Sequence, residues 1–233
     1  MNMCGRFTLT VDISELAAAF GAQVKNYRHA PRYNIAPGQD IPVVTQGPGG
    51  RVIIPMRWGF IPPWTGDERT SYKMINARAE TVAGKPAYRQ SFRHRRCLVP
   101  ADGFYEWKKE GRTKRPLRII LPGEKLFAFP GLWSAWRPAG GGVVHTCCII
   151  TTAANEYLEA VHHRMPVIFT EEQEYALWLS SDDTSLLQAL LRPYGGEMVA
   201  YPVSSRVNAP ENDDPRLIER ARDRLFADND LVD

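Results

Sequence analysis

Short runs of β-branched and aromatic residues, closely separated by turn residues, recur along most of this 233-residue chain. Residues 41–46 and 51–58 flank Gly47-Pro48-Gly49-Gly50, a pattern that predicts a β-hairpin. Because no long helical segments alternate with the predicted strands, we expect an α+β fold: a mixed, largely antiparallel sheet or open β-barrel with peripheral helices. Further predicted strands are 5–10, 97–99, 104–108, 117–121, 126–129, 143–151 and 167–169.

Helical patterns are short. Ser14, Leu16, Ala17 and Phe20 predict an amphipathic helix that ends at Gly21. A hydrophobic content of 44% is ample for one core, so we expect a single domain over residues 1–233. From about Glu211 the chain is charged and poor in apolar residues, which predicts a partly disordered tail, although 215–226 could form a surface helix. Further predicted helices are 156–161, 171–179 and 185–191.

The cysteines and the apolar runs indicate a reduced, cytoplasmic protein. Cys4, Cys97, Cys147 and Cys148 show no metal-ligand spacing, and the Cys147-Cys148 pair lies in an apolar run typical of core thiols. No apolar stretch approaches the roughly 20 residues that span a bilayer, and the first residues do not resemble a signal peptide. We therefore expect no secretion, no metal and no cofactor.

The net charge of +3 conceals an asymmetry, because residues 1–120 carry +11 and residues 121–233 carry −8. Basic residues are interleaved with aromatic residues and prolines in 32–38 and 57–64. Such surfaces hold single-stranded nucleic acid by stacking bases and contacting phosphates. Unpartnered surface cations are the commoner explanation of any one basic cluster, and core packing is the better explanation of Trp58 taken alone.

Cys4 would combine two nucleophiles if the chain began with it. An α-amine has a pKa near 7.8, so part of it is free base at neutral pH and can attack an aldehyde. The thiol can then add to the same carbon and close a five-membered ring. Taken alone, a small buried residue of a first strand explains this cysteine better.

Three other polar residues stand in apolar or turn-rich surroundings, and each has a structural explanation. Glu106 alternates with aromatic residues, so taken alone it is better explained as a solvent-facing strand residue. His162 follows a predicted helix, whose dipole favours a cation at that end. Asn76 could satisfy a turn or a helix cap.

Six motifs occur in one order along residues 3 to about 210. They are Met3-Cys4-Gly5-Arg6-Phe7, Arg32-Tyr33-Asn34-Ile35-Ala36-Pro37, Trp58-Gly59, Ile75-Asn76-Ala77-Arg78-Ala79-Glu80, Cys97-Leu98-Val99-Pro100-Ala101-Asp102-Gly103-Phe104-Tyr105-Glu106-Trp107 and His162-His163-Arg164-Met165-Pro166. In this order they resemble the motifs of the SRAP family of abasic-site processing proteins.

The resemblance implies a monomer that crosslinks itself to abasic sites in single-stranded DNA, through a thiazolidine between Cys4 and the deoxyribose aldehyde. It implies that Asn76 orients the N-terminal residue and the sugar. Glu106 would bond the amine or shuttle its protons, and His162 would act as acid and base on the opening sugar. An imine intermediate also permits β-elimination, so an abasic-site lyase activity is expected. The residues implied to contact DNA are Arg6, Asn34, Pro37, Trp58, Trp64 and Arg78.

The chain departs from the family pattern by carrying Met1-Asn2 ahead of Met3-Cys4. We expect either translation from Met3 or removal of the leader by self-processing, because Cys4 in mid-chain has only an amide nitrogen.

Two other functions use the same features. An N-terminal-cysteine amide hydrolase would turn over a small amide, whereas a crosslinker is consumed by its DNA. A non-catalytic binder would show salt-sensitive binding to intact single strands and form no covalent product.

Overall fold

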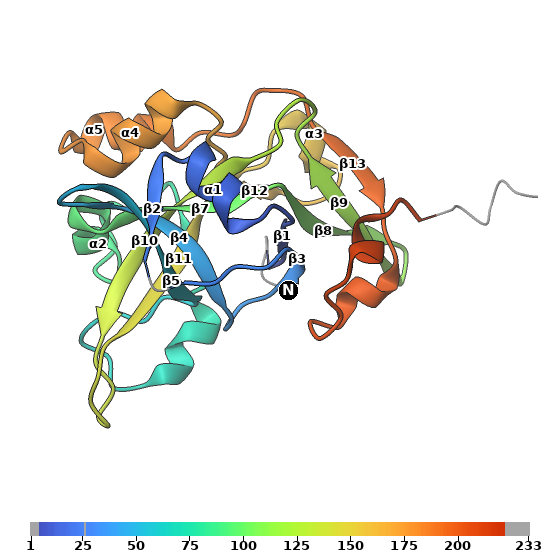
Figure 1. The fold of residues 1–233 in the computed structure, drawn as a ribbon. Coiled ribbons are helices and arrows are strands. Elements are labelled where there is room, and N and C mark those ends of the chain that lie inside the picture. The colour runs from blue at the N-terminus through green and yellow to red at the C-terminus, as the bar shows by residue number, and fades with distance from the viewer. Residues whose placement is uncertain (1–4, 26, 222–233) are drawn as a thin grey trace, which may run out of the picture.

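The computed structural model describes residues 5–25 and 27–221, which form two β-sheets with helices at the periphery (Figure 1). This arrangement confirms the predicted α+β class. The strands are β1 Phe7–Leu9, β2 Ala22–Val24, β3 Arg32–Ile35, β4 Asp40–Gly47, β5 Gly50–Trp58, β6 Asn76–Arg78, β7 Arg96–Ala101, β8 Gly103–Glu110, β9 Thr113–Ile120, β10 Phe127–Trp136, β11 Val144–Ala153, β12 Arg164–Pro166 and β13 Val199–Pro202. The helices are α1 Ile13–Ala19, α2 Arg89–His94, α3 Glu156–Glu159, α4 Glu172–Ser180 and α5 Thr184–Leu190, with 3₁₀ turns at Glu68–Lys73, Ser205–Asn208 and Pro215–Ile218.

Strands β10, β7, β4, β5 and β11 form a closed ring. Four of its contacts are antiparallel, and the ring closes through a parallel pairing of Thr146 with Arg57 and of Cys147 with Trp58. The barrel is therefore closed where the sequence suggested an open one. Closure leaves no edge among these strands available for pairing with another chain.

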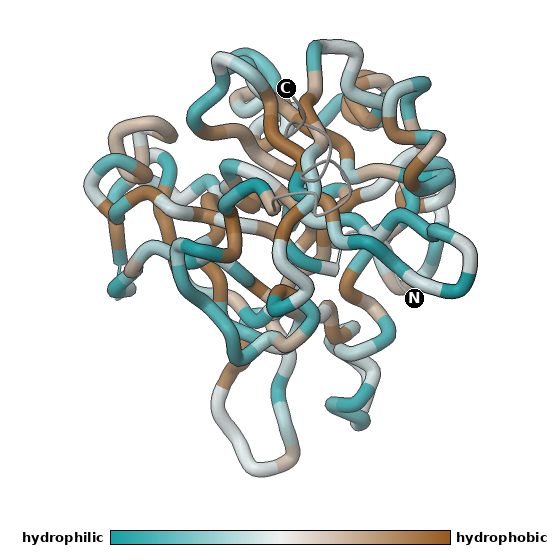
Figure 2. The backbone as a smooth tube through the Cα atoms, turned by 90° about the vertical axis from the view of Figure 1, so that its right-hand side faces the viewer, coloured by the Kyte–Doolittle hydropathy of each residue, from teal (hydrophilic) through white to brown (hydrophobic). Residues whose placement is uncertain are grey.

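The second sheet is antiparallel, in the order β13-β9-β8-β1-β3. Phe7 of β1 links it to the barrel, because its ring lies edge-on to Trp58 at 5.2 Å and to Phe129 at 6.0 Å. Phe104 of β8 reaches Phe129 in the same way at 6.0 Å. Figure 2 shows the hydrophobic stretches concentrated in the interior strands and the hydrophilic ones in the outer loops. The start of β1 is therefore anchored between the two sheets.

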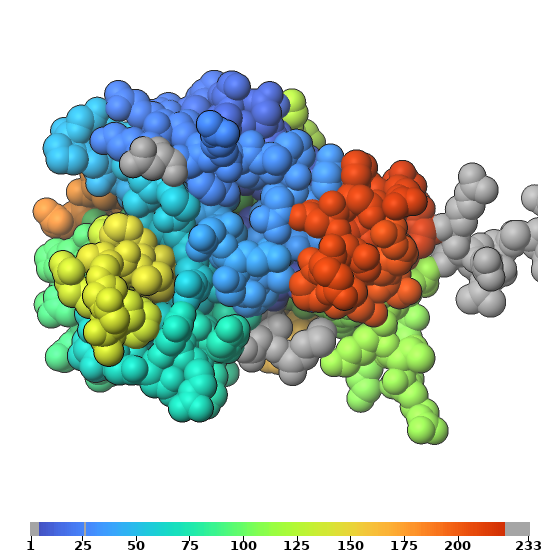
Figure 3. Space-filling view, turned by 60° about the horizontal axis from the view of Figure 1, so that its bottom comes forward, coloured from blue at the N-terminus to red at the C-terminus, as the bar shows by residue number. Residues whose placement is uncertain are grey.

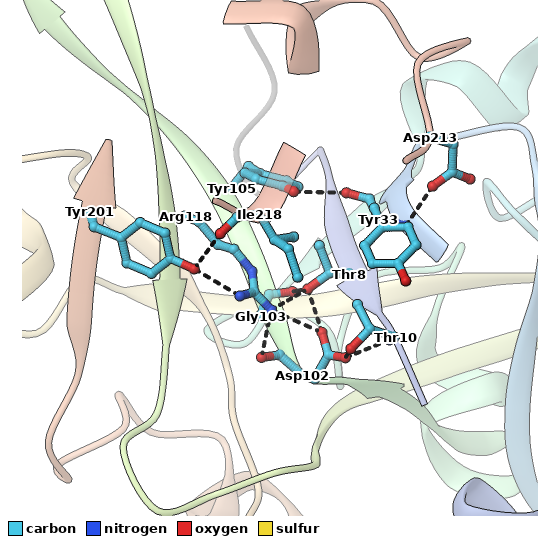
Figure 4. Close-up of polar contacts among 10 residues, drawn as sticks. All are labelled: Thr8, Thr10, Tyr33, Asp102, Gly103, Tyr105, Arg118, Tyr201, Asp213 and Ile218. Carbon is cyan, nitrogen blue, oxygen red and sulfur yellow. Dashed lines mark hydrogen bonds and ion pairs between the residues drawn. The ribbon is translucent and has the colours of Figure 1, made fainter. Parts of the chain in front are cut away.

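A buried ion pair between Asp102 and Arg118 also connects the β1 segment with its neighbours in the second sheet (Figure 4). Asp102 Oδ2 accepts hydrogen bonds from the amide of Thr10 at 2.5 Å and from its hydroxyl at 2.6 Å, and Oδ1 accepts one from Thr8. Arg118 approaches Asp102 Oδ1 at 3.3 Å and donates to the Tyr201 hydroxyl at 2.8 Å. Hydrogen bonds from several partners compensate the buried Asp102 carboxylate, as a buried charge requires, while Arg118 Nε has no hydrogen-bond partner among the described residues.

The helices and turns follow local sequence. Asp12 caps α1 by accepting a hydrogen bond from Glu15 N at 2.8 Å, and Gly21 stops the helix with φ of +54°. The predicted hairpin forms between β4 and β5. The strand predicted at 167–169 is wrong in position: the strand there is β12, which pairs with β11, and the following residues cross to a single bridge between Phe169 and Ala128.

The segment from Glu211 is ordered as far as residue 221, and the rest of the predicted partly disordered tail lies outside the described residues. Leu217 is fully buried, and Ala221 N donates to Pro202 O at 2.8 Å. Asp213 accepts hydrogen bonds from the amides of Tyr33, at 2.5 Å, and Asn34, at 3.0 Å. A few specific contacts to β3 and β13 therefore order a segment whose composition is typical of a tail. Within the described part of the predicted surface helix at 215–226, the structure has a short 3₁₀ turn at Pro215–Ile218.

Among residues 5–25 and 27–221, no helix is long and apolar enough to cross a membrane.

Candidate functional site

The start of β1 runs beside β8. Phe7 pairs with Phe104, and Tyr105 N donates to Arg6 O at 3.0 Å. Continuing this antiparallel register by one residue aligns Gly5 with Glu106. Cys4 lies outside the described residues, so its predicted role stays a prediction.

Glu106 is only 3% exposed, which contradicts its interpretation as a solvent-facing residue. Strand β8 packs on both faces: Phe104 lies in the main core, while Tyr105 packs in a second cluster and donates to Tyr33 O at 2.7 Å. Because side chains alternate along a strand, Glu106 shares the face of Phe104. A glutamate is rarely buried in this way unless other groups interact with it, so this carboxylate is a strong candidate for a chemical role.

Strand β11 aligns two further motifs. Its residues Ile149 to Thr151 pair with β6, so Asn76 lies opposite Ile149 and Arg78 opposite Thr151. The opposite edge of the same part of β11 pairs with β12, which follows His162 directly. The Asn76 and His162 motifs thus flank one short length of strand.

Arg164 ties these two motifs together. Its guanidinium forms two hydrogen bonds with the Glu80 carboxylate, at 2.7 and 3.0 Å, and one with Thr151 O at 2.6 Å. The fork geometry of an arginine suits such a bidentate pair. Arg164 lowers the pKa of Glu80 by this hydrogen bonding.

The His162 ring is half-buried and held in one tautomer. Its Nδ1 accepts a hydrogen bond from Arg164 N at 3.2 Å, so the neutral ring carries its proton on Nε2. The ring stacks on His163 at 4.4 Å, and His163 is exposed. Burial lowers the pKa of His162, and the neighbouring His163 lowers it further. The neutral imidazole is therefore favoured.

Two of the side chains predicted to contact DNA are fully buried in this conformation, so their contact with DNA stays a prediction. Trp58 is fully buried, and its Nε1 donates to Ile75 O at 2.9 Å. This hydrogen bond fixes the backbone of Ile75, which directly precedes Asn76. Trp58 therefore supports the site from the protein interior.

Asn34 is also fully buried, and it organises the C-terminal segment. Its amide donates to the carbonyls of Val207, Ala209 and Asn212 at 3.2, 3.1 and 2.8 Å. Its carbonyl accepts a hydrogen bond from Arg6 Nη1 at 2.8 Å. Figure 3 shows this orange-red segment packed beside the blue residues of β3.

A first groove, of about 520 Å³, opens beside the start of β1. It brings together the predicted residues Arg6 and Pro37. Arg6 also donates to Val207 O at 2.6 Å and lies over the Trp107 ring at 5.9 Å, so its guanidinium is held at the groove wall. The lining residues are Gly5, Arg6, Pro37, Tyr72, Ile75, Trp107, Lys114 and Asn208.

A second groove, of about 550 Å³, shares one chain segment with the first, because Tyr72 and Ile75 line the first groove and Lys73, Met74 and Asn76 line the second. It brings together the predicted residues Trp64, Asn76 and Arg78. Trp64 is 64% exposed and Arg78 is exposed, so both can meet a ligand. The lining residues are Pro62, Trp64, Lys73, Met74, Asn76, Ala77, Arg78, Lys85, Pro86, Ala87 and Tyr88.

Several residues that line the grooves were not predicted from the sequence as site residues. Tyr72 is 68% exposed and lines the first groove, while Lys73 and Lys85 line the second. The Tyr72-Lys73 pair, an aromatic residue beside a cation directly ahead of the Asn76 motif, was a usable signal. Trp107 belongs to one of the six motifs and lines the first groove, but it was not predicted to contact DNA.

The two grooves have the composition of a polyanion-binding surface. Both grooves combine exposed aromatic side chains with cations, and a buried carboxylate lies next to the first. Within the described residues, no group of histidine, cysteine or acidic side chains could hold a metal ion. Cys97, Cys147 and Cys148 are buried, and burial raises the pKa of each thiol, as expected for core residues.

Known proteins are similar to this chain in sequence and in fold. The chain is 46% identical over 223 residues to the abasic site processing protein YoqW of Bacillus subtilis, covering 93% of this chain and 99% of that protein. It is 30% identical over 261 residues to the abasic site processing protein HMCES of Gallus gallus, covering 93% and 77%. A crystal structure of a protein from Bacteroides thetaiotaomicron matches with a TM-score of 0.85 at 28% identity, covering 94% of this chain and all of that one.

The family described as SOS response associated peptidase (SRAP) matches residues 3–210, which is most of the chain and includes every motif discussed above. The resemblance drawn from the sequence is thereby confirmed, and the chain belongs to the SRAP family.

Proposed function

We propose that this protein binds single-stranded DNA at abasic sites and forms a covalent crosslink to them through Cys4. The observation that carries the proposal is a pair of grooves, lined by cations and aromatic rings, whose linings alternate along the segment from Tyr72 to Arg78. The first groove includes Gly5 and Arg6 at the start of β1, beside the buried Glu106. A strand that occupied both grooves would cross this segment. The names of the curated relatives support abasic DNA as the ligand.

The proposed reaction needs a free α-amine on Cys4. The amine adds to the C1′ aldehyde of the ring-opened deoxyribose, and loss of water gives an imine. The thiol then adds to the imine carbon while the nitrogen takes up a proton, which closes a thiazolidine. One water leaves overall, and no oxidant or reductant is required.

Residues near the site have the properties that these steps need. Glu106 would exchange protons with the amine, and Asn76 would orient the sugar through its amide. His162 presents a neutral ring with a proton on Nε2, which it could give to the ring oxygen of the opening sugar. If the imine loses its 3′-phosphate by β-elimination before the ring closes, the strand is cleaved, so a lyase activity would accompany the crosslink.

The leader Met1 to Met3 would be removed before this reaction. We infer removal by self-processing or translation from Met3, since an amide nitrogen cannot form the imine. The peptidase in the family description agrees with one self-directed cleavage. The protein would act as a monomer in the cytoplasm.

Intact mass spectrometry tests the proposal, before and after incubation with an oligonucleotide carrying one abasic site. The expected result is a protein that begins at Cys4 and gains the mass of the oligonucleotide less one water. A protein that crosslinks with its leader still attached would refute the terminal-amine reaction. Turnover of a small amide without any DNA adduct would establish the hydrolase instead.

A further inference from the structure

The end of the β8–β9 hairpin, residues 108–115, concentrates positive charge. It contains five basic residues and one acidic residue, Glu110. Strand β13 pairs with β9 only from Leu117 to Ile120, so this end extends past the neighbouring strand. Figure 3 shows the light green hairpin projecting from the surface. The basic residues are Lys108, Lys109, Arg112, Lys114 and Arg115.

The register places like charges directly opposite each other. Lys108 pairs with Arg115, and Lys109 pairs with Lys114. Opposed like charges destabilise an antiparallel pair, and solubility alone is better served by mixed signs. A bound polyanion would reverse this cost.

One face of the hairpin continues the first groove. Lys114 and Trp107 both line that groove. Lys109 lies opposite Lys114 and two residues beyond Trp107, so all three side chains share one face. From Trp107 to Glu110 the strand extends the groove wall by about 10 Å, because each residue adds about 3.4 Å.

We propose that Lys109 and Lys114, with Arg112 at the tip, bind phosphates of the DNA strand where it leaves the first groove. The hairpin is then a second binding arm, which contacts nucleotides outside the abasic one. The inference rests on the proposed function only in assuming that a DNA strand occupies this groove. Cations contact phosphates without reading sequence, so the arm would hold any flanking sequence.

Fluorescence anisotropy with intact, labelled single strands tests the arm. The variant is Lys109→Gln/Arg112→Gln, which changes two hairpin residues that do not line the first groove. The control is Lys25→Gln/Lys125→Gln, which removes the same charge from two exposed residues outside the grooves and the hairpin. Strands are either just long enough to fill both grooves or extended on the 5′ or the 3′ side. Each is titrated at several salt concentrations, and thermal melting confirms that both variants are folded.

The arm predicts a loss that depends on strand length. Each phosphate contact on a single strand contributes about 0.7 to the slope of log affinity against log salt, so the hairpin variant should lower that slope by about 1.4 on strands extended on one side. This corresponds to roughly 25-fold weaker binding at 0.1 M salt. The short strand should bind nearly as tightly as it does to the unmodified protein.

Three results would overturn the arm: unchanged affinity for every strand, equal losses on short and extended strands, or equal losses in the control. Equal losses on all strands would place Lys109 and Arg112 against the nucleotides inside the groove. Because the strands are intact, the comparison holds whether or not the protein crosslinks. Absence of a crosslink to abasic DNA would contradict the proposed function separately.

Discussion

Replacing Asn34 with alanine distinguishes a structural role from direct DNA contact. The side chain is fully buried and accepts one hydrogen bond from Arg6, and its amide nitrogen lies within hydrogen-bond distance of three backbone carbonyls between Val207 and Asn212. The two N–H groups of that amide make two full hydrogen bonds among these three carbonyls. Each such bond contributes about 1 kcal/mol, and its loss leaves a buried polar group unsatisfied. We therefore expect Asn34→Ala to lower the free energy of unfolding by about 3 kcal/mol. For a chain of this size that corresponds to a melting temperature lower by about 6–12 °C.

Urea unfolding followed by tryptophan fluorescence measures this loss, and anisotropy at low temperature measures DNA binding by the folded variant. Arg6 keeps its hydrogen bonds to Val207 O at 2.6 Å and Asn208 O at 3.1 Å, so Asn34→Ala should lose less affinity for single strands than Arg6→Ala. Asn208→Ala is the matched control: it removes one exposed hydrogen bond from Trp107, at 2.7 Å, and should cost less than about 1 kcal/mol. A structural role for Asn34 would be contradicted if the free energy of unfolding of Asn34→Ala lay within about 1 kcal/mol of that of the unmodified protein while the variant lost its affinity for DNA.

Three further predictions concern the proposed chemistry and the support of the site. Cys4→Ser with a free N-terminus should lose the stable adduct on denaturing gels but keep an imine that borohydride traps, whereas Cys97→Ser, a buried thiol, should change neither; a stable adduct of Cys4→Ser without reductant would identify another nucleophile. Glu106→Gln and His162→Ala should each slow adduct formation by about 10²–10⁴-fold in timed gels while intact DNA still binds, and unchanged rates would remove both from the reaction. Because the pKa of Glu80 is lowered in the folded state, its ion pair should add stability at neutral pH and lose it as the pH falls below about 4. The difference between the urea midpoints of unfolding of the unmodified protein and Glu80→Gln should therefore disappear at acidic pH. A difference that does not depend on pH would contradict this linkage.

Local patterns in the sequence predicted the elements but not the faces that they bury. Strand periodicity and turn residues located the β4–β5 hairpin, because these signals act over a few residues. The apolar spacing after Ser14 and the stop at Gly21 located α1 in the same way, although its N-cap is Asp12. The same periodicity assigned Glu106 to solvent. It failed because β8 packs on both faces, and a strand covered on both sides shows no polar face in its sequence.

The site was predicted mainly through motif order, which does not reveal the burial produced by long-range contacts. Trp58 and Asn34 belong to the right motifs, but their hydrogen bonds to Ile75 and to residues 207–212 bury them, and no local pattern reveals such partners. The ordering of 211–221 was missed for the same reason, since Asp213 binds backbone amides about 180 residues away. Composition reports the average tendency of a segment and cannot detect one anchoring carboxylate.

The contact between Arg6 and Val207, 201 residues apart, has a consequence for the timing of synthesis. The N-terminal residues leave the ribosome first, but one wall of the first groove, at Asn208, is among the last parts of the described chain to be made. At about 5–20 residues per second, roughly 10–40 s separate the two events. A nascent chain would therefore expose its cysteine well before it could hold a DNA strand against it. Productive capture of damaged DNA would be confined to molecules whose translation is almost complete.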